Sequence, residues 1–331
     1  MEKNRVSVFL INFNSFPYVK YCIESILSQN RKFFEILIFD NGSSDRSVNF
    51  LKDLKNVKLY INEKNIGFCG GFNFLFKESK GDWILLINPD VKLPSDFNEK
   101  LNDFLKEKAL ENIGSISPKI FRAEGDELKE TKIIDSTGIY LNPFFRALDR
   151  GSNEIDKGNY EKIEYVFGST GACAIYNKNA LMEVKFNEEI MDERFFVYRE
   201  DVDLAFRLQW KGYKTIYLPS LYAYHKRFNL PKRRKKMPKE INYHSLKNRY
   251  LIRGKNETFL IFLILSPFTF IYEILIFLYC LFFERSSLKS YIYFFKNLKS
   301  TLKWRKFTLK YKKVSSFYIL SYFLWKRKRY Q

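Results

Sequence analysis

Residues 83–93 read WILLINPDVKL, and this stretch decides which fold the chain can adopt. Its first five residues, Trp83 to Ile87, are all apolar, which is typical of a strand buried on both faces of a sheet. Asn88, Pro89 and Asp90 follow at the point where such a strand should end. The stretch therefore predicts a core strand that places one carboxylate, that of Asp90, at the edge of a sheet.

The residues before this strand alternate between short runs rich in β-branched and aromatic residues and longer runs with helical spacing. Such alternation is typical of βαβ units and a mostly parallel sheet. We expect strands within 5–12, 34–40, 57–62 and 81–93, helices within 16–29 and 45–54, and a glycine-rich loop with a third helix within 63–79. The predicted fold class is therefore α/β, with three crossovers before Asp90.

The carboxyl ends of the predicted strands are the place to look for a ligand, because open α/β sheets bind ligands there. We expect Asn12, Asp40, residues 67–73 and Asp90 to gather along this edge. A dinucleotide-binding fold would need a G-x-G-x-x-G turn after the first strand, but INFNSFPY (11–18) contains no glycine. The chain also has no Walker A sequence, so P-loop binding of ATP or GTP is not expected.

The composition restricts the class of protein further. The 331 residues include 57 Lys and Arg against 37 Asp and Glu, a formal net charge of +20, which favours polyanions or an anionic membrane surface as partners. The four cysteines form no CxxC pair, which indicates reduced thiols and no zinc site. The apolar run at the N-terminus is too short for a secretory signal. We therefore expect the catalytic part to lie in the cytoplasm.

Six segments of the chain occur in an order and spacing typical of one enzyme family. They are VSVFLINFNSFPYVKYCIESILSQ (6–29), ILIFDNGSSDRS (36–47), NIGFCGGFNF (65–74), LLINPDV (85–91), GSTGACAIYNKNAL (168–181) and FFVYREDVDLAFRLQWKGYKTIYLPSLYAYH (195–225). Together they resemble the family 2 glycosyltransferases of the GT-A fold, in particular the bacterial rhamnosyltransferase-like branch that builds polysaccharide on lipid carriers. The resemblance spans roughly residues 5 to 225.

The resemblance implies a divalent metal at the end of the fourth strand. Enzymes of this fold commonly use Mg²⁺ or Mn²⁺, hard cations held by carboxylates and by the phosphate oxygens of a nucleotide-sugar donor. The family's Asp-x-Asp motif stands here as Asn88-Pro89-Asp90. Asp90 is thereby implied as a metal ligand and Asn88 as a hydrogen-bonding group, while His225 matches a position where an imidazole completes the metal sphere. A plain turn and a structural histidine are the alternatives.

The resemblance places the nucleotide-sugar donor along the same edge. Asp40 would accept a hydrogen bond from the base of the donor, although an Asx-type turn is an alternative role for this carboxylate. The glycines of NIGFCGGFN allow a close approach of the backbone to a diphosphate, but ordinary turns use the same residues. The implied donor-binding residues are Asn12, Asp40, Asn41, Gly67, Gly70, Gly71, Asn73 and Asn88.

An acidic pair, Glu200 and Asp201, precedes apolar residues that recur at helical spacing from Val202 to Trp210. The pair therefore falls at a helix N-terminus, where the macrodipole favours carboxylates, and simple capping is one interpretation. In the family, the second acid of this pair deprotonates the acceptor hydroxyl in a single inverting displacement. Asp201 is thus implied as the general base, with Glu200 orienting the acceptor and Asp203 supporting the start of the helix.

The segment GSTGACAIYNKNAL is implied as the wall on the acceptor side of the site. Its first residues are small, which would leave room for a sugar, although a tight entrance to a strand would use the same residue types. The implied acceptor-side residues are Gly168, Ser169, Thr170 and Gly171.

The composition changes in the C-terminal third of the chain. A basic run, residues 226–236, precedes an apolar run over 259–283, and further basic segments follow. About 20 apolar residues can span a bilayer, but Pro267 would kink such a helix and Glu273 is costly in hydrocarbon. We therefore expect two short interfacial helices or a re-entrant hairpin, with a buried hairpin in an oligomer as the alternative. The basic segments would bind anionic head groups.

The sequence thus predicts a GT-A catalytic domain (1–228), a basic linker and helix (229–257) and apolar membrane-associated helices with a basic tail (258–331). The expected enzyme is an inverting, metal-dependent hexosyltransferase. It would move a sugar, rhamnose by resemblance, from a nucleotide-diphosphate donor to a saccharide on polyprenyl diphosphate, in cell-surface polysaccharide or lipopolysaccharide synthesis.

We expect this enzyme at the cytoplasmic face of the membrane, peripheral or monotopic, on an anionic surface and without a nucleic-acid partner. A homodimer is one arrangement compatible with the sequence. The alternatives are a nucleic-acid-binding α/β protein that uses the basic tail, and an inactive scaffold of the same family. The presence of Asp40, Asp90 and Asp201 together argues against the scaffold.

Overall fold

The structure is a computed structural model that describes residues 4–107, 110–228, 238–324 and 328–329. Its N-terminal part contains the four parallel strands that the sequence predicts, in the order β4-β1-β2-β3. These strands are β1 (Val6–Asn12), β2 (Glu35–Asn41), β3 (Lys58–Asn62) and β4 (Trp83–Ile87). Every residue of β4 is buried, which confirms the burial expected from its apolar sequence.

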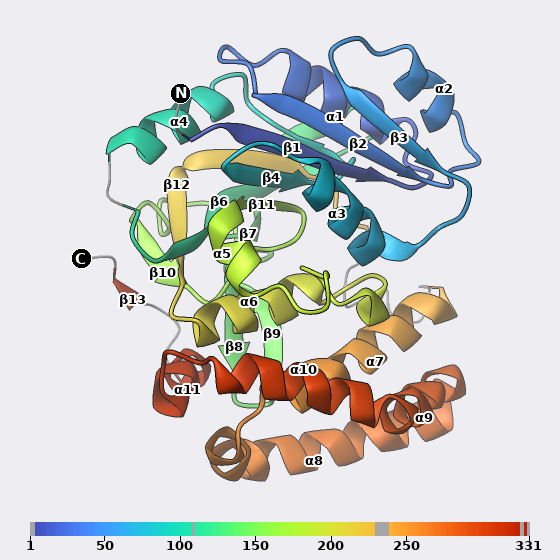
Figure 1. Cartoon of the computed structure of the whole chain (residues 1–331), viewed down its shortest axis with the longest axis vertical. Helices are drawn as coiled ribbons and strands as arrows, with labels where there is room; N and C mark the ends of the chain where they lie inside the picture. Colours follow the sequence, from blue (N-terminus) through green and yellow to red (C-terminus); the bar gives the residue numbers. More distant parts are fainter. Residues whose placement is uncertain (1–3, 108–109, 229–237, 325–327, 330–331) are drawn as a thin grey trace.

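Three helices connect these strands and confirm the three crossovers (Figure 1). They are α1 (Tyr18–Leu27), α2 (Ser47–Lys52) and α3 (Gly67–Glu78). The glycine-rich stretch differs from the expectation, because Gly67, Gly70 and Gly71 lie in the first turns of α3 and not in a loop before it. A Cβ on Gly71 would lie 3.0 Å from side-chain atoms of Ile11 and Phe39. This glycine therefore lets α3 pack closely on β1 and β2.

The sheet continues on the other side of β4 with mainly antiparallel pairing. β11 (Cys173–Asn177) pairs with β4, and β6 (Ile113–Glu124), β12 (Lys214–His225) and β10 (Glu164–Val166) follow. The shorter strands are β5 (Val91–Lys92), β7 (Lys129–Ser136) and β13 (Lys328–Arg329), and the flanking helices are α4 (Phe97–Glu107) and α5 (Lys178–Glu183). The α/β fold class is confirmed, with a parallel core extended by antiparallel strands.

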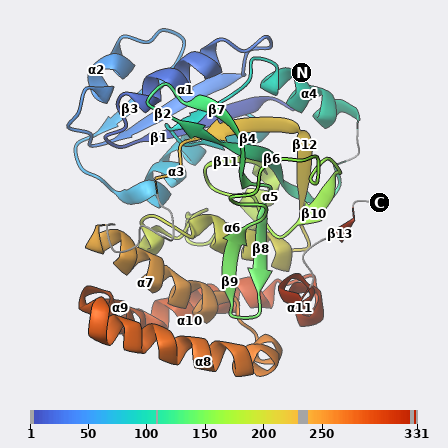
Figure 2. The ribbon, with the colours of Figure 1, turned by 180° about the vertical axis from the view of Figure 1, so that it is seen from behind.

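A small hairpin, β8 (Ile139–Asn142) and β9 (Arg146–Asp149), projects from this body. Figure 2 shows that it reaches from the central sheet to a helical layer at the other end of the molecule. Phe145, between the two strands, stacks on Phe206 of α6 (Glu200–Trp210), with ring centroids 5.7 Å apart. The hairpin therefore connects the sheet, α6 and the helical layer.

The C-terminal residues form this helical layer. Its elements are α7 (Lys239–Asn256), α8 (Phe259–Phe283), η3 (Arg285–Leu288), α9 (Lys289–Lys296), α10 (Leu298–Lys310) and α11 (Ser316–Leu324). Ile252, Ile261 and Phe323 of the layer belong to the same buried apolar cluster as Phe206. Packing is therefore continuous across the boundary predicted at residue 258. Residues 229–237 of the predicted basic linker lie outside the described residues.

The apolar run corrects one expectation, since residues 259–283 form a single helix, α8, and not two short ones. Pro267 lies inside this helix and offers no N–H to the carbonyl of Leu263. The hydroxyl of Ser266 donates a hydrogen bond to that carbonyl, at 3.0 Å. The helix thus continues past the proline because a neighbouring side chain satisfies the freed carbonyl.

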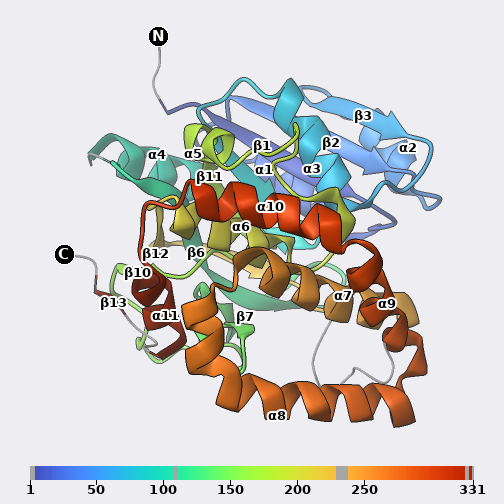
Figure 3. The same ribbon diagram turned by 60° about the horizontal axis from the view of Figure 1, so that its bottom comes forward.

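Glu273 faces the protein, so its charge does not prevent the exposed side of α8 from being apolar. Its carboxylate accepts hydrogen bonds from Arg249 (2.6 Å) and Arg253 (2.8 Å) of α7. Figures 1 and 3 show α8 at the outer edge of the molecule. Within the described residues, α8 is the one helix long and apolar enough to cross a membrane, and only 17% of its most apolar window is buried.

Candidate active site

Asp90 and His225 lie side by side at the carboxyl end of β4. After Asn88 and Pro89 the chain enters β5, which pairs antiparallel with the end of β12, so that Val91 lies opposite His225. Asp90 Oδ1 and His225 Nε2 are consequently 3.6 Å apart. The structure thus brings together the two residues predicted to bind a metal.

A third residue of this cluster, Asp135 of β7, belongs to no sequence motif and was not predicted. Its buried Oδ2 lies 2.8 Å from His225 Nδ1, and its Oδ1 lies 3.5 Å from Arg122 and 3.1 Å from Arg227. Burial lowers the pKa of His225, but the carboxylates of Asp90 and Asp135 outweigh burial and raise it to about 10. Asp135 therefore fixes the ring with Nε2 directed at Asp90.

The Asp90–His225 pair has the chemistry of a divalent-cation site. Asp90 Oδ1 is buried and has no hydrogen-bond partner among the described residues. One cation could contact both side chains, because metal–ligand bonds of about 2 Å bridge their 3.6 Å separation. No group of three or more His, Cys, Asp or Glu ligands occurs in the part of the chain that the structure describes. A bound Mg²⁺ or Mn²⁺ would therefore take its other ligands from phosphate and water.

Asn12 and Asp40 lie opposite each other at the ends of β1 and β2, as predicted, but both are buried. Asn12 Nδ2 donates to Asp40 Oδ2 (2.6 Å), and the backbone N–H of Ser43 donates to Asp40 Oδ1 (3.0 Å). The second bond is the turn contact considered as the alternative role. Recognition of a base by Asp40 stays a prediction.

Asn41 and Asn73, also predicted to bind the donor, hold backbone segments in place. Asn41 Oδ1 accepts from the N–H of Ile66 (2.8 Å), and its Nδ2 donates to the carbonyl of Gly67 (3.0 Å). Asn73 bonds both the N–H (2.9 Å) and the carbonyl (2.8 Å) of Met191. Both side-chain amides are buried and are hydrogen-bonded to backbone groups, which they hold in place. Binding of a donor by these amides would require breaking these hydrogen bonds.

The glycines at the start of α3 are explained by packing. Gly67 has φ +83°, and a Cβ there would lie 2.7 Å from the carbonyl oxygen of Phe196. That oxygen accepts a hydrogen bond from the N–H of Cys69 (3.3 Å). A Cβ on Gly70 would lie 3.0 Å from the side chain of Ile66. The glycines thus bring α3 against the segment that leads into α6, and a contact with a diphosphate stays a prediction.

Glu200 and Asp201 begin α6, as the sequence predicts, and neither forms an ion pair with another described residue. Asp201 accepts hydrogen bonds from the backbone N–H groups of Gly171 (2.9 Å) and Val202 (2.8 Å). Glu200 Oε2 is buried and has no partner within the described residues. Burial and the charge of Asp201 raise the pKa of Glu200 to about 8, and burial also raises the pKa of Asp201. Raised pKa values of buried carboxyl groups are typical of sites that transfer protons.

The segment before the acidic pair is strained. Phe196, Tyr198 and Arg199 have φ values of 64°, 70° and 66°, in the left-handed region that non-glycine residues rarely adopt. Asn248 of α7 holds this segment, because its Nδ2 donates to the carbonyls of Val197 (2.9 Å) and Tyr198 (2.6 Å). The helical layer therefore helps to set the direction in which the acids point.

Asp203 supports the start of α6, as predicted, through a buried charge network that was not. Lys255 of α7 is fully buried and donates to Asp203 and to Asp192, at 2.9 Å each. Arg207 also donates to Asp203, at 2.9 Å. Burial raises the pKa of Asp203, but Lys255 and Arg207 outweigh burial and lower it. One side of the first turn of α6 is thus neutralised by cations, whereas the Glu200–Asp201 side is not.

The two clusters are neighbours because β4 pairs with β11. At the end of β4 the N–H of Asn88 donates to the carbonyl of Ala172 (2.9 Å). The preceding residue, Gly171, donates its N–H to Asp201 (2.9 Å). A short run of backbone contacts therefore connects the Asp-containing turn of β4 to the acidic end of α6.

Arg227 connects the same clusters from another side. Its Nε lies 3.1 Å from Asp135, and its Nη2 donates to Asp149 at 2.5 Å. Burial lowers the pKa of Arg227, but the carboxylates of Asp149, Asp135 and Asp201 together raise it. In the sequence this residue belongs to the basic run, whereas the structure places it inside the site.

The residues predicted on the acceptor side, Gly168, Ser169, Thr170 and Gly171, are all buried. A Cβ on Gly168 would lie 2.5 Å from the Cβ of Ala205 in α6. The small residues therefore make room for α6 and lead tightly into β11, which was the alternative interpretation. Their place on the acceptor side of the site stays a prediction.

Solved structures with a similar arrangement define the class of fold. The chain superposes on GalNAc-T7 with UDP, GalNAc and Mn²⁺ with a TM-score of 0.58 and 14% identity, over 77% of this chain and 48% of that chain. It superposes on S. aureus TarS 1–349 with a TM-score of 0.50 and 15% identity, over 80% and 70%. At these identities the likeness concerns the fold, which is that of the GT-A glycosyltransferases.

The sequence profile of glycosyl transferase family 2 matches residues 7–185, more than half of the chain, and the protein belongs to this family. Asp90 lies inside the matched segment, whereas Asp201 and His225 lie beyond it. The predicted family resemblance is confirmed.

Two curated relatives extend the comparison beyond the matched segment. A dolichyl N-acetyl-alpha-D-glucosaminyl phosphate 3-beta-D-2,3-diacetamido-2,3-dideoxy-beta-D-glucuronosyltransferase of Methanococcus voltae is 26% identical over 286 residues, 82% of this chain and 80% of the relative. An N-acetylglucosaminyl-diphospho-decaprenol L-rhamnosyltransferase of Mycobacterium tuberculosis is 25% identical over 236 residues, 66% of this chain and 75% of the relative.

Proposed function

We propose that the protein is an inverting, metal-dependent glycosyltransferase that moves a sugar from a nucleotide-diphosphate donor to a lipid-linked saccharide. The observation that carries this proposal is the link between the Asp90–His225 pair and the Glu200–Asp201 pair through the backbone hydrogen bonds of the β4–β11 ladder. Single-step sugar transfer needs stabilisation of the departing diphosphate and a base for the attacking hydroxyl. The two pairs offer one of these functions each.

Asp90 and His225 would hold Mg²⁺ or Mn²⁺ beside the donor phosphates, with the cation replacing the proton that His225 carries near neutral pH. Such a cation, when bound, neutralises the charge that develops on the nucleoside diphosphate. Asp201 takes the proton of the acceptor hydroxyl as its oxygen bonds to the anomeric carbon and the bond from that carbon to the phosphate oxygen breaks. Attack and departure on opposite faces invert the configuration. Glu200, whose raised pKa keeps a proton on it near neutral pH, adds no second negative charge beside the base.

The nature of the acceptor is inferred from the relatives. One acts, by its name, on a dolichyl N-acetylglucosaminyl phosphate, and the other on an N-acetylglucosaminyl-diphospho-decaprenol. Both names join N-acetylglucosamine to a polyprenyl chain through phosphate, whereas the transferred sugars differ. We therefore propose a polyprenyl-linked saccharide as the acceptor class in surface polysaccharide synthesis, including lipopolysaccharide, with rhamnose as one candidate sugar.

We propose that the protein lies on the cytoplasmic face of the membrane, peripheral or monotopic, and the exposed apolar side of α8 supports the association with a membrane. Phe270, Phe282 and Phe283 are 69%, 67% and 72% exposed, and a contiguous apolar surface of this kind is costly in water. The variant Phe270→Gln/Phe282→Gln should reduce flotation with phosphatidylcholine vesicles. The matched control is Phe34→Gln, an exposed apolar residue near the N-terminal sheet. Equal flotation of all three proteins would contradict insertion of α8.

The experiment that tests the transfer reaction uses the full chain in detergent. A panel of nucleotide sugars is offered with Mg²⁺, Mn²⁺ or EDTA and with N-acetylglucosaminyl-diphospho-decaprenol, and release of nucleoside diphosphate and the change in Tm are measured. One donor should raise the Tm in a metal-dependent way that Asp90→Ala abolishes. Asp96→Asn, in a surface ion pair with Lys100, is the control. Absence of stabilisation by every donor under all metal conditions would contradict the proposal.

A further inference from the structure

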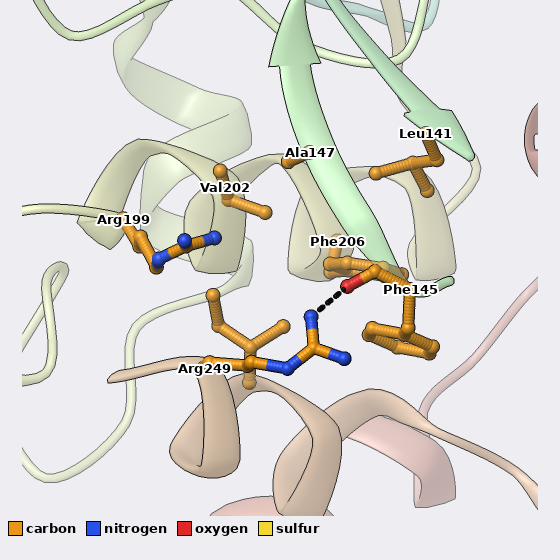
Figure 4. A pocket seen from close by; sticks show the side chains of 8 residues that line it. Leu141, Phe145, Ala147, Arg199, Val202, Phe206 and Arg249 are labelled. Carbon is orange, nitrogen blue, oxygen red and sulfur yellow. Dashed lines mark hydrogen bonds between the residues drawn. The ribbon is translucent and has the colours of Figure 1, made fainter. Parts of the chain in front are cut away.

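Arg199, directly before the acidic pair, forms no ion pair with any carboxylate that the structure describes. Its side chain reaches into a pocket between α6, α7 and the β8–β9 hairpin (Figure 4). Its Nε is buried without a hydrogen-bond partner in the described part of the chain, and its Nη2 reaches Ser245 Oγ only at 3.5 Å. A buried Nε–H without a hydrogen-bond partner is costly, and a guanidinium in this position is suited to an anionic ligand.

A second guanidinium, that of Arg249 in α7, lies in the wall of the same pocket. It is fully engaged, because it donates to the carbonyls of Phe144 (2.9 Å) and Phe145 (2.7 Å) and to Glu273 (2.6 Å). Arg249 therefore fixes the turn of the hairpin and adds positive charge to the pocket, but it leaves the binding of a further ligand to other residues.

A third guanidinium belongs to Arg146, the first residue of β9. It lies over the ring of Tyr272 in α8, 5.7 Å from the ring centroid, and Arg249 lies over the same ring at 5.1 Å. Arg146 forms no ion pair with any residue that the structure describes. Burial and the charges of Arg249 and Arg146 lower the pKa of Arg199 to about 10, so Arg199 remains cationic near neutral pH.

The charges of this region do not balance. Arg249 shares Glu273 with Arg253, and Arg253 also pairs with Glu257 at 2.8 Å. Of the four arginines, Arg249 and Arg253 form ion pairs, whereas Arg146 and Arg199 have no carboxylate within ion-pair distance among the described residues. The charge of Asp201 acts on Arg199 from beyond that distance. Two arginines that lack carboxylate partners are suited to binding phosphate, because each planar guanidinium can donate two parallel hydrogen bonds to phosphate oxygens.

The position of the two arginines matches the order of groups in a lipid-linked acceptor. Tyr272, on which Arg146 stacks, belongs to α8, whose opposite side is exposed and apolar. Arg199 adjoins Glu200 and the base, Asp201, in the chain. The protein thus presents, in order, an apolar surface, the two arginines and the base. A lipid-linked acceptor presents, in the same order, a polyprenyl chain, a phosphate and a saccharide.

We propose that Arg146 and Arg199 bind the phosphate or diphosphate that joins the acceptor saccharide to its lipid. This inference rests on the proposed function, and it adds a binding site between α8 and the catalytic acids. The same chemistry could recognise a phospholipid head group, so the test must separate the two sources of phosphate.

The test measures binding and does not require turnover. Full-length protein is floated with vesicles of phosphatidylcholine alone, with added undecaprenyl diphosphate, with added undecaprenol, or with added phosphatidylglycerol. We expect undecaprenyl diphosphate, but not undecaprenol, to increase binding to the vesicles. In Arg146→Gln/Arg199→Gln this increase should be about tenfold smaller, while binding to phosphatidylglycerol vesicles persists. Lys303→Gln/Lys306→Gln, on the exposed side of α10, removes the same charge elsewhere and should keep the increase.

Three outcomes would overturn the site: undecaprenol binds as well as its diphosphate, the arginine variant binds as the wild type does, or the lysine control loses as much as the arginine variant. A variant that loses phosphatidylglycerol equally would overturn it too, by assigning the arginines to general head-group binding. The single variant Arg146→Gln, away from the strained segment, separates loss of binding from misfolding. Failure of all nucleotide sugars to stabilise the protein would contradict the proposed function. The flotation experiment would still show whether the two arginines bind the lipid phosphate.

Discussion

The two carboxylate clusters of the site differ in what balances their charge. Asp90 and Asp135 lie on either side of His225, and arginines approach Asp135 as well. Glu200 and Asp201 have no ion-pair partner among the described residues, and Asp201 receives only backbone hydrogen bonds. The first cluster is therefore built around positive charge, whereas the second retains uncompensated negative charge.

This difference separates two chemical tasks within one site. A cluster that stabilises positive charge suits a cation and the diphosphate beside it. A cluster in which burial and repulsion raise the pKa suits the uptake of a proton. Two sequence motifs that both contain acidic residues can therefore differ in function, because the side chains around each carboxyl group determine whether it binds a cation or accepts a proton.

The largest effect on the difference between the two clusters is expected from removal of the proposed base. Asp201→Asn keeps the size of the side chain and its place at the start of α6 but removes the proton acceptor, so the transfer rate should fall about 10²- to 10⁴-fold. Donor binding, measured as the rise in Tm with nucleotide sugar and metal, should persist because the Asp90–His225 pair is intact. Turnover close to that of the wild type would assign the base elsewhere. Asp96→Asn is the surface control.

The next effect concerns the neutralised side of α6. Lys255→Met leaves Asp192 and Asp203 buried without their shared cation, which should lower the free energy of unfolding by about 3–5 kcal/mol. Urea unfolding followed by circular dichroism measures the loss. Lys303→Met, at an exposed position of α10, is the control and should change stability little. Equal stability of the two variants would show that the buried network does not hold α6 to α7.

A smaller effect is expected from the residue that positions His225. Asp135→Asn keeps a hydrogen-bonding group beside Nδ1 but removes the charge, and metal affinity should fall about 10- to 100-fold. Titration with Mn²⁺ in the presence of bound donor, followed by electron paramagnetic resonance, measures this change directly. Asp126→Asn, which removes an exposed ion pair with Lys226, should leave the affinity unchanged. A merely structural role for Asp135 would lower Tm without this shift in affinity.

The sequence predicts those parts of the fold and the site that depend on patterns within a short segment of the chain. The strand at Trp83–Ile87, the turn that carries Asp90 and the helix that starts at Glu200 follow from runs and spacings within a few residues. Family resemblance added the pairing of Asp90 with His225, which are far apart in the chain, and the structure places them together.

The residues that could not be predicted from the sequence act across long separations. Asp135 meets His225 90 positions later, and Lys255 meets Asp203 52 positions earlier. No periodicity marks such pairs, because the register of neighbouring strands and helices brings them together. The apolar helix α8 was wrongly divided because Pro267 and Glu273 were judged without their neighbours, a serine hydroxyl in one case and α7 arginines in the other.

The smallest expected effect is the contribution of Glu200 to the pH dependence of stability. The pKa of Glu200 lies at about 8 in the folded protein against an ordinary value of 4.5, so between these values the folded state holds a proton that the unfolded state has released. The contribution of Glu200 to stability should therefore fall as pH rises through this window, by at most about 1.4 kcal/mol from about pH 6 to about pH 7. His225, whose pKa is raised to about 10, adds a slope of the same sign above its ordinary pKa of 6.5. Glu200→Gln should make the slope shallower by the part that Glu200 contributes, and urea unfolding at several pH values measures it. Glu99→Gln, on the surface helix α4, should keep the slope of the wild type. An unchanged slope in Glu200→Gln would mean that burial beside Asp201 does not hold the proton.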